Sequence, residues 1–146
     1  MKKLLVLTVA LLTMSASAFA AGIGYVDYQR VSENYAFAKA AIKEIDNQTL
    51  ALQSYMLEKE KQYKALDTPL KKQNFEAVTA KEFQAKQEAL QKLKEQKEEQ
   101  VYNKIQAATK QILVEQKLDA VLDYRVIFVG GLDITDLVIN KLKTMP

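Results

Sequence analysis

The chain contains a run of 87 residues, from Ser32 to Leu118, that has no glycine and only one proline, Pro69. Within this run, 59 residues are Ala, Gln, Lys, Glu or Leu, which are strong helix formers. All four glycines lie outside it, in short segments rich in β-branched and aromatic residues. We therefore expect a long helical excursion that projects from a small β-containing head. Projecting arms of this kind usually bind another molecule.

The first twenty residues have the pattern of a secretory signal peptide. Lys2 and Lys3 precede a nine-residue apolar core, 4–12, which is too short to span a bilayer. Ala18 and Ala20 then supply the small residues that signal peptidase recognises. We expect export and cleavage after Ala20, with a site two residues earlier as an alternative. A membrane anchor that is retained is the less favoured interpretation.

Composition argues against catalysis and against nucleic acid as a partner. Loss of Lys2 and Lys3 lowers the 21 basic residues to 19, against 18 acidic ones, so the exported chain is almost neutral. Histidine and cysteine are both absent, and with them the commonest general base, the commonest metal ligand and any disulfide. No phosphate-binding glycine loop occurs. We expect no catalytic residue, no cofactor and no metal site.

A 4-3 spacing of mostly apolar residues predicts the seam of a helical hairpin. Its positions are Ala38, Ile42, Ile45, Thr49, Leu52, Met56, Lys59, Tyr63, Leu66 and Leu70. Thr68 and Pro69 suit a cap and a first helical position, so a kink or restart is expected there. Thr79 to Glu82 matches a capping box, and we place the main reversal between Lys72 and Thr79.

The returning helix has a polar interruption at 94–100, which contains no apolar residue. With a reversal near position 75, this segment would face 46–54, whose first half is also polar. One interpretation is a solvated face. The other is a hinge that lets the outer arm splay.

Three short strands and a C-terminal helix are predicted for the head. Gly22–Val26 is the first strand, and 120–123 and 126–129 form a hairpin. Four consecutive apolar residues at 126–129 imply burial on both faces of the sheet. Asp27 is expected to cap a helical turn that bends near Asn34.

After Gly130 and Gly131, which are expected to form a flexible connection, the segment 133–136 is expected to cap the final helix. Its apolar side would carry Ile134, Leu137, Val138 and Leu142. The head, 21–31 and 118–146, has only about 40 residues, which rarely form a stable core alone. We therefore expect partner chains at the head and assign 32–117 to the arm.

The distal half of the arm is the candidate binding region. Seven apolar or aromatic residues lie there among lysines: Tyr55, Met56, Tyr63, Leu66, Leu70, Phe75 and Phe83. A two-helix seam uses two positions per heptad, whereas Tyr55, Met56 and Leu57 are consecutive. Some apolar surface must therefore face outward or into the space between arms, where Met and Tyr suit promiscuous contacts.

The order of these features resembles the Skp/OmpH family of periplasmic chaperones over nearly the whole exported chain. The resemblance lies in the signal peptide, the strand leading into Val26-Asp27-Tyr28, the long hairpin and two C-terminal motifs. These motifs are Val121-Leu122-Asp123 and Asp133-Ile134-Thr135-Asp136-Leu137-Val138-Ile139.

The resemblance implies an α+β fold, assembled as a homotrimer around a barrel-like body, with helical tentacles that enclose a cavity. It also implies ATP-independent holding of unfolded outer-membrane β-barrel proteins in the periplasm. Six residues would build the body between the subunits: Ile23, Tyr25, Val121, Leu122, Ile127 and Val129. The inner faces of 45–105 would line the cavity.

Charge favours apolar contact over electrostatic capture in this arm. Residues 55–95 hold nine lysines against seven acidic residues, whereas better-known family members look strongly basic. Anionic lipid or lipopolysaccharide is therefore a weakly supported partner. The rival to the chaperone hypothesis is a coiled-coil adaptor or spacer of the envelope, which would bind one folded partner through a continuous, tightly packed seam.

Overall fold

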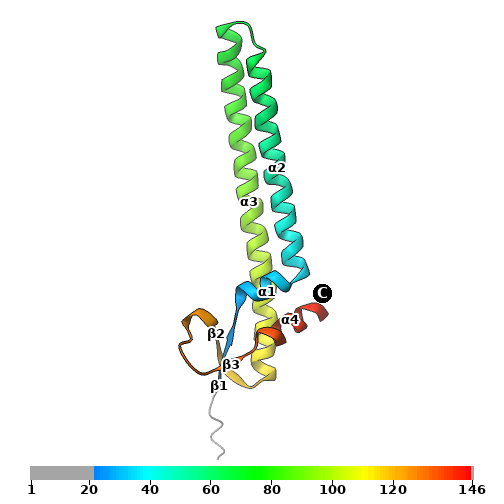
Figure 1. Ribbon diagram of the computed structural model, residues 1–146, viewed down its shortest axis with the longest axis vertical. Coiled ribbons are helices and arrows are strands. Elements are labelled where there is room, and N and C mark those ends of the chain that lie inside the picture. Colours follow the sequence, from blue (N-terminus) through cyan, green and yellow to red (C-terminus); the bar gives the residue numbers. More distant parts are fainter. Residues whose placement is uncertain (1–21, 146) are drawn as a thin grey trace, which may run out of the picture.

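The structure is a computed structural model that describes residues 22–145, so the predicted signal peptide lies outside the described residues. Two long helices, α2 (Ala36–Lys64) and α3 (Pro69–Glu115), lie side by side and form a tall arm. At its base lies a head with a small sheet, the short helix α1 (Tyr28–Asn34) and the C-terminal helix α4 (Thr135–Thr144) (Figure 1). The α+β class and the helical hairpin are confirmed.

The sheet joins the N-terminal strand to two strands near the C-terminal end of the described residues. They are β1 (Gly22–Val26), β2 (Leu118–Asp123) and β3 (Leu132–Asp133), in the order β2-β1-β3. Both outer strands run parallel to β1. Gly24 lies in the central strand, and a Cβ atom there would come within 2.7 Å of the Leu118 side chain. A larger residue at position 24 would therefore require the Leu118 side chain to move.

The predicted hairpin between 120–123 and 126–129 is wrong. After β2 the chain forms a 3₁₀ turn, Tyr124–Val126, because the Asp123 carboxylate accepts a bond of 2.9 Å from the Arg125 backbone N–H and also binds its guanidinium. The third strand is β3 rather than 126–129, and within this chain the predicted burial of 126–129 is wrong as well. Gly130 and Gly131, at φ of 83° and 91°, return the chain to the sheet.

Side-chain hydrogen bonds mark the starts of α1 and α4 close to where the sequence predicts. Asp27 accepts a hydrogen bond of 3.0 Å from the Arg30 backbone N–H at the start of α1, and the bend follows at Tyr35. Asp133 accepts from the backbone N–H of Thr135 at the start of α4. The hydroxyl of Thr135 in turn accepts from the backbone N–H of Asp27 at 3.0 Å. The two caps therefore hold α1 and α4 together.

The reversal of the arm lies between Lys64 and Pro69, which corrects the prediction of 72–79. Thr68 accepts a hydrogen bond from the Lys71 backbone N–H, and Pro69 takes the first helical position, where its missing N–H costs nothing. Thr79 and Glu82 lie inside the uninterrupted helix α3, so they form no capping box. Thr68 and Pro69, which predicted only a kink or restart, lie at the reversal of the arm.

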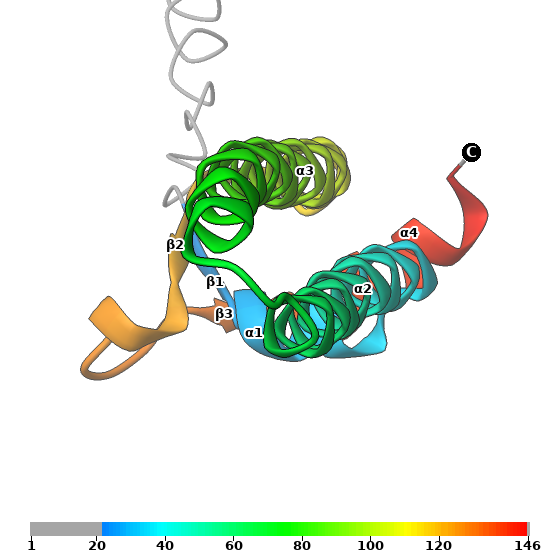
Figure 2. The same ribbon diagram turned by 90° about the horizontal axis from the view of Figure 1, so that it is seen from above.

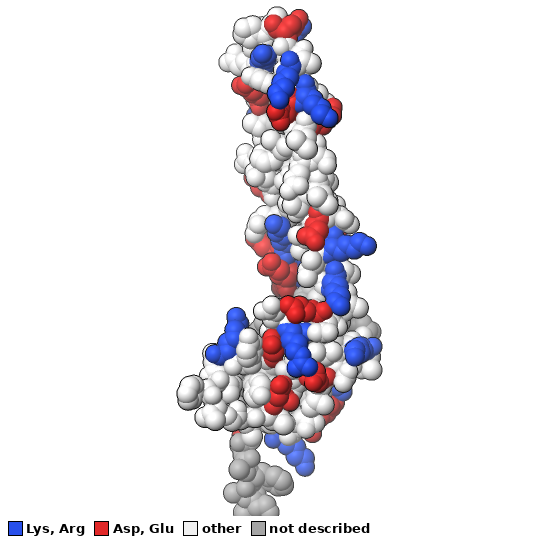
Figure 3. All heavy atoms as spheres, viewed as in Figure 1, with Lys and Arg blue, Asp and Glu red and all other residues white. Residues whose placement is uncertain are grey.

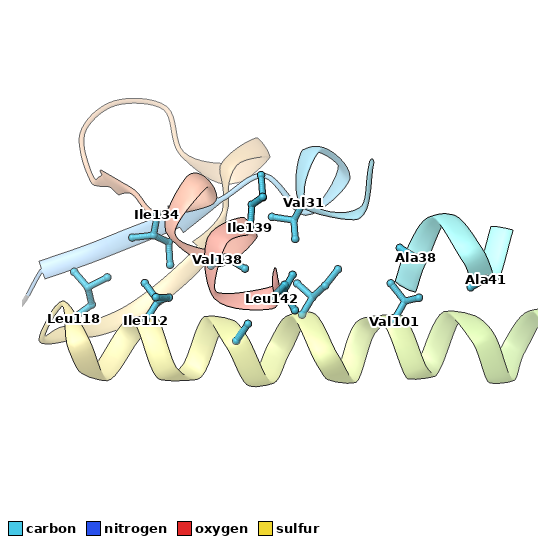
Figure 4. Packing of buried hydrophobic residues seen from close by; sticks show 12 residues of the cluster. Val31, Ala38, Ala41, Val101, Ile112, Leu118, Ile134, Val138, Ile139 and Leu142 are labelled. Atoms are coloured by element: carbon cyan, nitrogen blue, oxygen red, sulfur yellow. The ribbon is translucent and has the colours of Figure 1, made fainter. Parts of the chain in front are cut away.

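The buried core belongs to the head and the lowest part of the arm. Side chains of α1, α2, α3 and α4 meet there with Leu118 (Figure 4). Its members are Val31, Ala38, Ala41, Val101, Ile105, Ala108, Ile112, Leu118, Ile134, Val138, Ile139 and Leu142. On α4, the predicted apolar face is right for three positions, whereas Leu137 is 39% exposed and Ile139 is buried instead.

Above the head the two helices share a seam that is only half-buried. From Ile42 to Gln100 no residue is fully buried. Of the predicted α2 seam, Ile42 and Met56 are exposed, and Leu70 lies exposed on α3. Lys97 binds Glu44 at 2.6 Å. The polar segment 94–100 therefore faces the part of α2 near Glu44, closer to the head than the predicted 46–54. The earlier reversal shifts the register in this way.

Candidate functional site

A groove of about 970 Å³ runs between α2 and α3 in the distal half of the arm. Its apolar lining comes from both helices and includes Leu52, Met56, Leu57, Tyr63, Phe75 and Phe83. Residues of α2 reach it at intervals of three and four, because such spacing keeps side chains on one helix face. Because the residues of the seam are only half-buried, the apolar lining of the groove remains open to solvent in the single chain.

Two aromatic rings form one end of the groove. The centroids of Tyr63 and Phe75 are 6.3 Å apart, with the planes tilted by 46°. The Lys59 ammonium lies 5.5 Å from the centre of the Phe75 ring, and the Lys72 ammonium 5.4 Å from that of Tyr63. A hydrogen bond to Glu76 raises the pKa of Tyr63. Cations on these faces hold the rings in place across the two helices.

A polar cluster of Tyr55, Lys59 and Glu82 fastens the helices in the same part of the arm. The Tyr55 hydroxyl donates to Glu82 Oε2 at 2.6 Å, and Lys59 Nζ binds the same oxygen at 2.9 Å. The hydrogen bond from Tyr55, followed by that from Lys59, lowers the pKa of Glu82. Desolvation, followed by the hydrogen bond to Glu82, raises the pKa of Tyr55. The cluster joins α2 to α3.

Thr79 places one unpartnered hydroxyl in the groove lining. Its Oγ1 atom is buried and has no hydrogen-bond partner. Thr49 and Thr109, which also lie inside helices, donate instead to the carbonyl groups of Ile45 and Ile105, four residues earlier. Thr79 therefore carries an unsatisfied polar group in the distal seam.

The structure brings together four of the seven predicted binding residues. Met56, Tyr63, Phe75 and Phe83 line the groove. Tyr55 belongs to the polar cluster, Leu66 is half-buried at the reversal, and Leu70 is 67% exposed near the tip. The prediction omitted Leu52, Leu57 and Thr79. Leu57 was signalled by the consecutive apolar residues 55–57, and Leu52 by the 4-3 spacing, whereas the local signal at Thr79 was a capping box and did not indicate a groove residue.

The head exposes a second apolar surface around the 3₁₀ turn. Phe128 is fully exposed, Val129 is 86% exposed and Val126 is 69% exposed. Among the other predicted interface residues, Ile23 and Leu122 are exposed. Tyr25, Val121 and Ile127 are half-buried. Hydrogen bonds from the Arg125 guanidinium and backbone lower the pKa of Asp123 to about 2, which anchors the turn that presents this surface.

A hollow of about 1050 Å³ lies where the arm meets the head. Val26, Ile45, Val101 and Val121 contribute apolar lining, while Lys97 and Glu98 contribute charge. Seen from above, α2 and α3 rise over α1 and the sheet, while the turn after β2 extends to one side (Figure 2). This hollow and the apolar turn both adjoin β2, so the head carries contact surfaces distinct from the distal groove.

Comparison with known protein families decides the assignment. A family model described as outer membrane protein (OmpH-like) matches residues 22–142, which span the head and the whole arm. The chain belongs to the OmpH-like family. A search of curated proteins finds no match. Because the family match includes the strands as well as the helices, it does not rest on coiled-coil composition alone.

Among solved structures, the OmpH-like chain is similar to one named for an OmpH-like outer membrane chaperone from Caulobacter crescentus CB15. The two share 18% sequence identity, and the match covers 84% of this chain and 83% of the other, with a TM-score of 0.44.

Charged residues of both signs are spread along the OmpH-like chain, and seven ion pairs join some of them among the described residues. On the face shown in Figure 3, blue and red side chains lie close together along the arm, with an uncharged band between two charged groups. Within 22–145, no cluster of three or more acidic residues is arranged to hold a metal ion. None of the helices in this range combines the length and apolarity that crossing a bilayer requires.

Proposed function

We propose that this OmpH-like chain is a periplasmic holdase chaperone that binds unfolded outer-membrane β-barrel proteins without ATP. The observation that carries the proposal is the distal groove, where Met56, Leu57 and Phe83 expose apolar surface on an arm with a half-buried seam. A soluble chain keeps such a patch uncovered when the patch serves binding. Export by the predicted signal peptide would bring the chain to the periplasm.

We further propose that three copies assemble through their heads. Val126, Phe128 and Val129 are too apolar to stay in water on a head of this size, and they lie beside the outer strand β2. The predicted contact residues lie in β1, in β2 and just after the turn that follows β2: Ile23, Tyr25, Val121, Leu122, Ile127 and Val129. A closed ring of heads would direct the arms to one side, so that their grooves border a shared cavity.

Holding by this arrangement rests on many weak contacts. Each apolar side chain of a client buries a modest area in a groove, and each Å² of apolar surface buried contributes roughly 25 cal/mol of binding free energy. No single contact then prevents release, which follows when the client reaches a more stable folded state in the outer membrane. The adaptor alternative requires a tightly packed seam, and the absence of any fully buried residue between Ile42 and Gln100 argues against it.

The direct test dilutes a urea-unfolded outer-membrane barrel protein into buffer with and without a stoichiometric amount of the purified protein. We expect turbidity to be suppressed when the protein is present, without nucleotide. Native mass spectrometry of the same mixture should give three chains with one client. Equal turbidity in the two samples would eliminate the holdase proposal, and a single folded partner in pull-downs would favour the adaptor.

A further inference from the structure

We propose that the distal groove recognises extended client segments in which apolar and polar residues alternate. The groove thus selects the strand pattern of a β-barrel rather than overall hydrophobicity. This inference rests on the proposed chaperone function and adds the chemical class that the groove accepts. Three properties of the groove support it: its length, its one-sided apolar lining and the pairing of its charges.

The length of the groove suits a short extended segment. Its α2 residues run from Thr49 to Tyr63, and fourteen steps of about 1.5 Å give a length of about 21 Å. An extended chain rises about 3.3 Å per residue, so about six residues fit. Successive side chains point to opposite sides, which directs about three of the six into the groove.

The lining favours apolar side chains on that inward face. Leu52, Met56, Leu57, Phe75 and Phe83 offer aliphatic and aromatic contacts, and the flexible thioether of Met56 adapts to different shapes. The outward side chains of the same segment would meet water. A segment with alternating residues therefore buries its apolar side chains and leaves its polar ones hydrated, whereas one with its apolar residues grouped together exposes part of them.

The charges in the groove disfavour an anionic ligand. Its three charged lining residues already have partners: Lys59 binds Glu82, Glu60 binds Lys64, and Glu76 accepts from Tyr63. Two of these three residues are carboxylates, which repel phosphate groups. The lining therefore suits an uncharged apolar side-chain row better than the head group of an anionic lipid or of lipopolysaccharide.

Strands that span an outer membrane carry this alternating pattern. They are about 9–11 residues long, with apolar residues facing lipid and more polar residues facing the lumen. Each unfolded barrel therefore supplies many segments of the required pattern and of sufficient length. Several grooves in an assembly would bind several strands of one client at once and raise the total affinity without a strong single site.

A pair of leucines on α2 gives a matched test. Leu57 lines the groove and is 61% exposed, whereas Leu50, seven residues earlier, is 59% exposed and lies outside the lining. Substitution by serine at either position removes a leucine side chain that is exposed to a similar degree, so the free energy of unfolding should change little in both variants. The measurement is fluorescence anisotropy of two labelled peptides of identical composition, one alternating and one with its apolar residues grouped.

We expect the alternating peptide to bind the original protein about tenfold more tightly than the grouped peptide. Leu57→Ser should remove most of this difference, and Leu50→Ser should retain it. Equal binding of the two peptides by the original protein would overturn the inference. Equal weakening by Leu50→Ser and Leu57→Ser would overturn the assignment to the groove.

Two further measurements separate this inference from its alternatives. If Leu57→Ser lowers the oligomer mass in sedimentation while Leu50→Ser does not, a second copy occupies the groove and the inference is wrong. If the original protein suppresses client turbidity yet does not distinguish the peptides, the holdase function stands and the inference alone fails. If the protein does not suppress turbidity, the proposed function itself fails.

Discussion

The head and the arm share helix α3 but differ in how its residues are packed. At the base of the arm, where α3 packs on the head, Val101, Ile105, Ala108 and Ile112 are buried against α1, α2 and α4. From Pro69 to Gln100 the same helix has no fully buried residue. Secondary structure is therefore continuous across a sharp change in packing. The comparison teaches that the head supplies stability while the arm keeps apolar surface available.

The arm replaces a core with interactions across its surface. Tyr55 and Lys59 bind Glu82, Lys97 binds Glu44, and lysines lie over aromatic rings. Exposed ion pairs of this kind contribute little to stability and are screened by salt. The arm is therefore held by contacts that are individually weak.

The largest expected effect comes from Ile105→Ala at the base of α3, where this helix packs on the head and the side chain is only 3% exposed. Loss of this side chain leaves a cavity, and we expect the free energy of unfolding to fall by about 3 kcal/mol. Leu70→Ala in the arm, at 67% exposure, should change it by less than about 0.5 kcal/mol. Urea unfolding followed by circular dichroism at one protein concentration provides both values. Similar losses for both variants would contradict the division between a packed head and a loosely packed arm.

Local chemistry explains which parts of the fold could be predicted from sequence. Asp27, Thr68 and Asp133 each cap a helix through a bond to a backbone N–H two or three residues away, so their roles are visible in a short window. The 4-3 spacing similarly predicted the helical hairpin. The reversal was misplaced because two cap signals, at Thr68 and Thr79, lie eleven residues apart and only tertiary pairing chooses between them.

Non-local pairing explains what could not be predicted. Strand β1 takes both neighbours, β2 and β3, from about a hundred residues away, and no short window reveals their parallel direction. The apolar run 126–129 suited a buried strand, but three of its four residues are exposed in the single chain, where the Asp123–Arg125 bonds favour a turn. The candidate groove was predicted in part, since composition located the distal apolar residues but did not decide on which side of the seam each one lies.

A smaller effect, of opposite sign, is expected for Thr79→Val in the arm. The hydroxyl of Thr79 is buried without a partner, and valine keeps the shape while it removes that atom. We expect the free energy of unfolding to rise by about 1 kcal/mol. Thr49→Val is the matched control, because the Thr49 hydroxyl donates to Ile45 at 2.9 Å and its loss should give no gain. Equal destabilisation by the two substitutions would mean that Thr79 does have a partner.

The smallest expected effect concerns the pH dependence of the turn that presents Phe128 and Val129. The Arg125 guanidinium and backbone N–H lower the pKa of Asp123 from 3.8 to about 2. Because the folded-state pKa lies below the unfolded one, the carboxylate stabilises the folded head above about pH 4. This contribution is lost as the pH falls toward 2. Asp123→Asn should therefore have a lower Tm than the original protein at about pH 5.

The difference in Tm between Asp123→Asn and the original protein should then narrow toward about pH 2, because the original carboxylate becomes protonated. Other carboxylates titrate in both proteins, so the difference isolates Asp123. Arg125 is 73% exposed, and added salt should shrink the gap by screening the pair. A constant gap across this pH range would show that the carboxylate charge does not hold the turn. The backbone conformation of the turn alone would then keep Phe128 and Val129 exposed.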